Sequence, residues 1–178
     1  MQVRLQIGRA NPLDLKRDVA RRFAHVGTVL AVLMACSGFL VAVLWMDLMF
    51  DVQVLAHRGA PTLPEPVLAS IANYYHRVTT TARPMGHVIA VVMAVMLVSL
   101  GIRAAVGGDP PWLLGVAAVL AVGPVALALA RTVPNAVRLG RRTGTAAEQT
   151  RLARSICGQH LACLVSLVAF LAVWLFAA

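Results

Sequence analysis

Residues 24–51 read AHVGTVLAVLMACSGFLVAVLWMDLMFD, an apolar run that ends in two carboxylates. The apolar part, residues 24–46, is long enough to cross the roughly 30 Å hydrocarbon core of a bilayer as a helix. Asp47 and Asp51 follow at i,i+4 spacing, so they lie on one face of that helix. An unpaired charge at the end of a membrane span is costly. We therefore expect a membrane helix whose carboxylates need polar partners from elsewhere in the chain.

The rest of the chain is similarly apolar. Of its 178 residues, 60% are hydrophobic and 13% charged, with a mean hydropathy of +0.79. The apolar residues form unbroken blocks rather than amphipathic stripes, which predicts further spans at about 84–102, 111–130 and 156–177. No alternating barrel pattern is present, so the spans are helices. The predicted fold is an all-α integral membrane four-helix bundle, with residues 1–178 forming a single membrane domain.

The segments outside the spans are unequal in length and charge. A basic leader covers residues 1–23, and apolar residues at helical spacing predict an interfacial helix at about 67–79 in the first connection. Pro124 predicts a kink in the third span. Small residues allow close helix contacts in membranes, and we expect this role for Gly27, Gly38, Gly86, Gly101, Gly115, Gly123 and Gly158.

The formal net charge of +9 indicates membrane contact rather than nucleic-acid binding. The cations flank apolar runs, where anionic lipid headgroups hold them. The lipid bilayer is therefore an expected partner and nucleic acid is not. Orientation stays open: nine Lys and Arg residues on the side of the first and third connections, against seven on the other, favour an external N-terminus. The basic leader beside the first span favours the opposite.

Four crossings bring most of the polar residues near the spans into one leaflet. The end of the first span, the start of the second, the end of the third and the start of the fourth all lie there. The residues that these ends carry are Asp47, Asp51, Arg83, His87, Asn135, Arg138 and His160. We expect a polar intramembrane cluster at this level, with Tyr75 of the interfacial helix either capping it or anchoring in the headgroup region.

Three interpretations of this cluster remain open. The first is a structural network in which arginines neutralise the aspartates, as is usual for charges inside membrane bundles. The second is a substrate pocket in which His160 or His87 acts as a general base, Asp47 orients the imidazole and Asn135 holds a developing oxyanion. Asp51, Arg83, Arg138 and Tyr75 would then bind substrate or pair within the site.

The third interpretation is a haem or metal site. His87 and His160 are candidate axial haem ligands, and together with Asp47 and Asp51 they could ligate a metal ion. No metal motif such as H-E-x-x-H occurs in the sequence. No cofactor is therefore favoured, and haem and a metal ion stay as alternatives.

Residues 124–170 resemble the anthrone-oxygenase-like group of small four-helix membrane proteins. The matching elements are Pro134-Asn135 and Leu139 after the third span, and His160 near the start of the fourth. The chain lacks the Thr that this group can carry between the Pro and the Asn. The resemblance implies a single four-helix bundle and, by analogy with fungal members, oxidation of anthrones to anthraquinones as a cofactor-independent oxygenase. Most bacterial members have no assigned activity, and the bacterial cytoplasmic membrane is the expected location.

Two classes of function follow from the sequence. The leading hypothesis is a membrane protein that binds a hydrophobic aromatic or quinone-like small molecule in the polar pocket, with oxidation of that molecule as the implied activity. The alternative is a non-catalytic accessory or scaffold subunit that associates with other membrane subunits. Purification discriminates between them, because a scaffold would be recovered with its partners and without a ligand.

Overall fold

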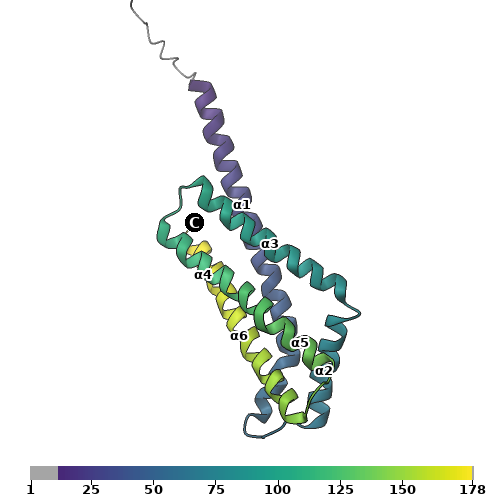
Figure 1. Cartoon of the computed structure of the whole chain (residues 1–178). Coiled ribbons are helices and arrows are strands. Elements are labelled where there is room, and N and C mark those ends of the chain that lie inside the picture. Colours follow the sequence, from purple (N-terminus) through teal and green to yellow (C-terminus); the bar gives the residue numbers. More distant parts are fainter. Residues whose placement is uncertain (1–11, 178) are drawn as a thin grey trace, which may run out of the picture.

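The computed structural model describes the backbone of residues 12–177 and the side chains of residues 24 and 26–177. The described chain consists of helices joined by short connections and contains no strand (Figure 1). Its elements are α1 (Pro12–Asp51), the 3₁₀ helix η1 (Val52–His57), α2 (Glu65–Thr79), α3 (Arg83–Val106), α4 (Pro111–Leu127), the π-helix η2 (Ala128–Thr132), α5 (Val133–Gly140) and α6 (Ala146–Ala177). Four helical segments are long and apolar enough to cross a membrane. The predicted all-α, four-span class is confirmed.

The helices extend beyond the apolar runs that predicted them. Residues 1–11 of the basic leader lie outside the described residues, and residues 12–23 are the first turns of α1 rather than a separate segment. Helix α6 begins at Ala146, ten residues before its apolar run. It begins there because a capping box precedes it: Thr145 N donates to Glu148 Oε2 at 2.7 Å, and Glu148 N donates to Thr145 Oγ1 at 3.3 Å. Hydropathy predicts the part of a helix that lipid surrounds, whereas capping decides where the helix starts.

Helices α1 and α6 run antiparallel and form the centre of the bundle (Figure 1). One apolar core lies along the spans and includes Leu33, Met96 and Phe170, each fully buried. A second core forms at the end of the bundle where α1 stops, around α2, α5 and the first turns of α6. Helix α2 contributes Leu68, Ile71, Ala72 and Tyr75 to this second core. The helix expected at 67–79 therefore packs one face into the protein.

A glycine determines how closely α2 and α5 pack. A Cβ added to Gly140, at the end of α5, would lie 2.7 Å from His76 N and 2.9 Å from Tyr75 C. Only glycine allows the two backbones to approach this closely. By contrast, a Cβ on any of the seven span glycines named from the sequence meets no atom of the described residues within 4 Å. The expectation that those glycines mediate close contacts within the chain is wrong, because all seven face outward.

The backbone is irregular after Pro124, where the sequence predicts a kink. Helix α4 nevertheless continues through Pro124 to Leu127 before it passes into the π-helix η2. Proline has no N–H to donate to the carbonyl one turn earlier, and for Pro134 that carbonyl belongs to Ala130, inside η2. The Val133 N–H donates to the Ala128 carbonyl, which is the i→i+5 pattern of a π-helix. An inserted π turn changes which residues of the following helix face inward. Because η2 ends where α5 begins, it sets which residues of α5 face the bundle.

Candidate functional site

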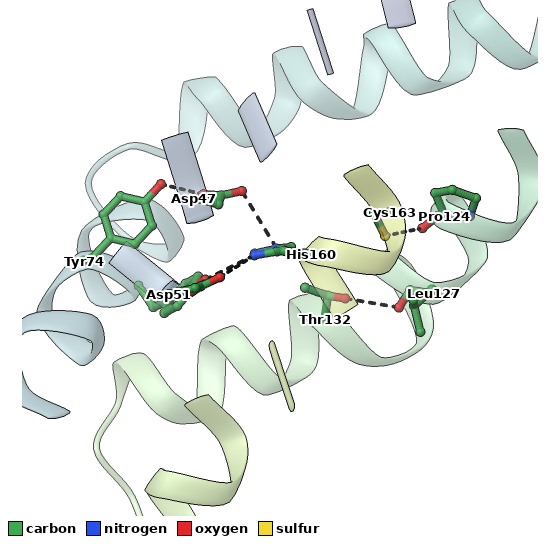
Figure 2. A network of polar contacts seen from close by, with 9 residues as sticks. Asp47, Asp51, Tyr74, Pro124, Leu127, Thr132, His160 and Cys163 are labelled. Carbon is green, nitrogen blue, oxygen red and sulfur yellow. Dashed lines mark hydrogen bonds and ion pairs between the residues drawn. The ribbon is translucent and has the colours of Figure 1, made fainter. Parts of the chain in front are cut away.

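A buried histidine lies between two carboxylates where α1 meets α6. His160 Nδ1 is 2.6 Å from Asp51 Oδ2, and His160 Nε2 is 3.8 Å from Asp47 Oδ2 (Figure 2). Asp51 is fully buried and His160 is 6% exposed. The two aspartates lie one helical turn apart on α1, so each faces a different nitrogen of the imidazole ring. The i,i+4 spacing in the sequence is what makes this clamp.

Two tyrosines of α2 complete the hydrogen bonding of the carboxylates. Tyr74 donates its hydroxyl to Asp47 Oδ1 at 2.5 Å, and Tyr75 donates to Asp51 Oδ1 at 2.7 Å. The Tyr74 ring also stacks on Phe50 of α1, with 4.0 Å between the ring centroids. We call Asp47, Asp51, Tyr74, Tyr75 and His160 the histidine cluster. Each of its carboxylates accepts one phenol and faces one imidazole nitrogen.

The phenols of the cluster stay protonated. Burial, followed by the neighbouring carboxylate, raises the pKa of Tyr74 well above its ordinary value, and the same causes raise the pKa of Tyr75. A phenolate beside a carboxylate would place two negative charges together in a poorly solvated site. Both tyrosines therefore serve as hydrogen-bond donors, and neither is a base.

The two nitrogens of His160 have different surroundings. At 2.6 Å, Nδ1 and Asp51 Oδ2 must share a proton, which places the hydrogen of the imidazole on Nδ1 when the ring is neutral. The 3.8 Å between Nε2 and Asp47 Oδ2 is too long for a hydrogen bond. The Asp47 side chain is also more exposed, at 16%, than the Asp51 side chain, at 0%. Nε2 and Asp47 Oδ2 are therefore the atoms of the cluster that are open to a further hydrogen-bond partner.

The loop between α1 and α2 is held against α6. Arg154 Nη2 donates to the carbonyls of His57, at 2.9 Å, and Ala60, at 2.6 Å. The Leu63 N–H donates to Thr150 Oγ1 at 3.0 Å, and Thr150 is fully buried. These contacts fix the start of α2, and Gly140 fixes its distance from α5. Together they place the two tyrosines over the aspartates.

Several predicted site residues lie away from the cluster. Arg83 and His87, at the start of α3, are exposed, Arg138 is exposed and Asn135 is half-buried. Among the described residues, none of these four has a hydrogen bond or ion pair with the cluster. The reason is α2, whose tyrosines occupy the position beside Asp47 and Asp51 where the sequence predicts the start of α3. The aspartates are compensated by phenols and an imidazole rather than by arginines.

The expected metal and haem ligands are not assembled either. His87 is exposed whereas His160 is buried, so the two do not face each other as axial ligands. In the part of the chain that the structure describes, no three His, Cys, Asp or Glu side chains are arranged to hold a metal ion. The cluster has the geometry of a proton-sharing site.

Sequence reasoning missed Gly140, Thr150 and Arg154, which position the site without belonging to it. The sequence does hold a signal for Arg154 and Thr150, because both are polar residues that precede the apolar run of α6 on the same helix as His160. Tyr75 is 2% exposed, so it does not anchor in the headgroup region. The close approach at Gly140 has no local signal, because it depends on where a distant helix packs.

A second polar contact lies at the opposite end of the bundle. Arg103 forms a bidentate ion pair with Asp109, and its Nε donates to Asp109 Oδ2 at 2.9 Å. Its guanidinium also lies 5.1 Å from the centroid of the Trp174 ring. This ion pair closes the turn between α3 and α4 on α6. Asp109 compensates the charge of Arg103, and all three guanidinium nitrogens donate hydrogen bonds, to Asp109 and to the Val26 carbonyl, which is typical of a structural contact.

Comparison with known proteins finds no matching family model, no matching curated protein and no matching solved structure. The fold and the site therefore define the class by themselves. The chain is an all-α integral membrane protein with four apolar helices suited to crossing the bilayer.

Proposed function

We propose that this protein binds a hydrophobic aromatic or quinone-like small molecule at the histidine cluster, in the bacterial cytoplasmic membrane, and oxidises it. The observation that supports this best is the 3.8 Å separation of His160 Nε2 and Asp47 Oδ2. A base and a carboxylate face each other there without a hydrogen bond between them. A ligand hydroxyl or an acidic C–H group is the kind of partner that both atoms lack.

Tyr74 illustrates how an aromatic hydroxyl fits beside Asp47. Its ring stacks on Phe50 while its hydroxyl donates to the carboxylate. Tyr74 is only half-buried, so a phenol of similar shape can replace it after a side-chain rotation. Trp45, Met46 and Met49 are 63%, 54% and 60% exposed on the same turns of α1. They give a molecule dissolved in the bilayer an apolar route to the cluster.

His160 is the base in this proposal. Asp51 holds the Nδ1 hydrogen and so leaves the lone pair of Nε2 to accept a proton. The resulting imidazolium lies between two carboxylates, which stabilise its charge. Asn135 and His87 form no hydrogen bond or ion pair with the cluster among the described residues, so His160, Asp47 and Asp51 carry the proposed chemistry.

The oxidation step follows from the resemblance to the anthrone-oxygenase-like group. Loss of the acidic C–H proton to His160 Nε2 leaves a carbanion, and dioxygen is the electron acceptor. Overall, one anthrone and one O₂ give one anthraquinone and one water. Every atom and electron is accounted for by these two reactants, and no redox cofactor takes part.

Binding and turnover are tested separately on the purified full chain. An anthrone or a quinol is titrated while tryptophan fluorescence is followed, and oxygen uptake is recorded with the anthrone. We expect saturable binding by the wild-type protein, weaker binding by Asp47→Asn and loss of oxygen uptake in His160→Gln. The exposed Arg77→Gln is the matched control. Equal binding by the wild type and Asp47→Asn would remove the support for this site.

The second candidate, an accessory subunit of a membrane complex, is supported by the outward-facing glycines. A Cβ added to any of the seven span glycines would meet no atom of the described residues within 4 Å, and small residues on an exposed helix face allow another helix to approach. Affinity purification of the tagged full chain in a mild detergent tests this. Stoichiometric recovery of another membrane subunit supports it, and recovery of the chain alone counts against it.

A further inference from the structure

A cavity of about 220 Å³ lies between η1 and the first turns of α6, and none of the histidine-cluster residues lines it. Its walls are largely apolar, formed by Val54, Leu55, Cys157, Gly158 and Leu161. The remaining lining residues are two cations, Arg58 and Arg154. No carboxylate lines the cavity within the described part of the chain. The site therefore combines positive charge with an apolar wall.

Neither of the two arginines has an anionic partner among the described residues. Arg154 uses Nη2 to hold two loop carbonyls, while its Nε is buried without a hydrogen-bond acceptor. Arg58 is exposed and, among the described residues, forms no ion pair. A buried charged donor without an acceptor is costly, and such groups often mark the place of an unseen ion or ligand. The occupant that suits this pair of guanidinium groups is an anion.

The position of the cavity favours a lipid. Arg154 lies two residues before the apolar run of α6, which is the level at which cations meet lipid headgroups. Along α6 from the cavity, Leu161, Val165 and Val168 are 39%, 68% and 48% exposed. Their i, i+4, i+7 spacing places them on one face of the helix. This face is an apolar ridge that runs from the two arginines into the membrane.

We propose that the cavity binds the phosphate of an anionic phospholipid, with one acyl chain along the α6 ridge. Arginine suits this ligand because its planar guanidinium donates two parallel hydrogen bonds to a phosphate. A lipid here would also stabilise the loop that Arg154 holds, and with it the start of α2. The proposal does not depend on the aromatic ligand proposed for the histidine cluster.

The test uses the full chain in detergent, titrated with phosphatidylglycerol or phosphatidylcholine and followed by native mass spectrometry. We expect the wild-type protein to bind phosphatidylglycerol more tightly than phosphatidylcholine. The affinity of Arg58→Gln for phosphatidylglycerol should be about fivefold lower than that of the wild type, which is the effect of removing one interfacial cation. Arg58 is the residue to change because Arg154 also holds the loop. The control is the exposed Arg77→Gln, which should retain the wild-type preference.

Three results would overturn the proposal. One is equal affinity of the wild-type protein for the two lipids, and another is an equal loss of affinity in the Arg58 and Arg77 variants. The third concerns the source of the phosphate. Inorganic phosphate that binds as tightly as phosphatidylglycerol, and displaces it completely, would assign the cavity to a soluble anion. Phosphate that fails to displace the lipid supports the lipid assignment.

Discussion

His160 Nδ1 and Asp51 Oδ2 lie 2.6 Å apart, although 109 residues separate them in the chain. The contact joins the end of the first span to the start of the last one inside the protein. Asp51 has no exposed surface, so its charge depends on this imidazole and on the Tyr75 hydroxyl. The stability of this end of the bundle should therefore depend on a small number of identifiable protons.

Asp51→Asn should destabilise the protein more than Asp47→Asn. The first change removes a buried charge from two short hydrogen bonds, which typically costs about 3–5 kcal/mol. The second changes a partly exposed carboxylate that lies 3.8 Å from the ring, and about 1 kcal/mol is expected. Unfolding of the detergent-solubilised variants by a denaturing detergent measures both values. A larger loss in Asp47→Asn would contradict the structure of the cluster.

Both tyrosines should resist alkaline titration while the protein is folded. The chain contains two tyrosines, Tyr74 and Tyr75, so the phenolate absorbance reports on the cluster alone. Burial and the carboxylates raise both folded-state pKa values above the ordinary value of about 10. The protonated tyrosines contribute fully to the stability of the folded state below about pH 10. This contribution is lost as the pH rises above that value, because only the unfolded chain releases the two phenol protons readily.

The measurement compares ultraviolet absorbance at about pH 11 in folded and denatured samples. The denatured chain should show nearly full phenolate absorbance, and the folded chain should show little. Asp47→Asn should lower the pKa of Tyr74, since a neighbouring negative charge is removed, and one tyrosine should then titrate earlier. Full titration of the folded wild-type protein near pH 10 would mean that the phenols are solvated.

The sequence predicts Asp47, Asp51 and His160 of the histidine cluster, whereas for Tyr75 it leaves capping of the cluster and anchoring in the headgroup region as alternatives. The proximity of Asp47, Asp51 and His160 is predictable from the sequence, because the number of spans decides which helix ends share a leaflet. Each span is a long apolar run, and the bilayer imposes the same length requirement on all four. The prediction of which helix ends lie together depends only on the lengths of the apolar runs and on their order along the chain, and both can be read from the sequence.

The partners from α2 could not be chosen in the same way. The start of α3 and the tyrosines of α2 were both available to the aspartates, and the choice depends on tertiary packing of short segments. Gly140 lets α2 pack closely on α5, while Thr150 and Arg154 hold the loop before α2. These contacts join residues far apart in the chain. No local pattern indicates them.

Gly140→Ala should displace α2 and weaken the cluster from a distance. The added methyl group would meet backbone atoms at Tyr75 and His76, which cannot rotate away, and overpacking of this kind costs about 1–3 kcal/mol. Gly158→Ala is the control, because a Cβ there meets nothing within 4 Å. The alkaline absorbance of the tyrosines gives a second measurement. Gly140→Ala should let Tyr75 titrate at lower pH, and an unchanged titration would show that Gly140 does not position it.

Asp109→Asn should destabilise the opposite end of the bundle without affecting the histidine cluster. Arg103 is 9% exposed and would lose the carboxylate that both compensates its charge and accepts two of its hydrogen bonds. Leaving a buried guanidinium without its anion typically costs about 3–5 kcal/mol. Because Trp174 lies under that guanidinium, its fluorescence should change, whereas the tyrosine titration of the folded protein should stay that of the wild type. If Asp109→Asn altered the tyrosine titration as strongly as Gly140→Ala, the two ends of the bundle would unfold as one unit. The histidine cluster would then have no stability independent of the Arg103–Asp109 ion pair.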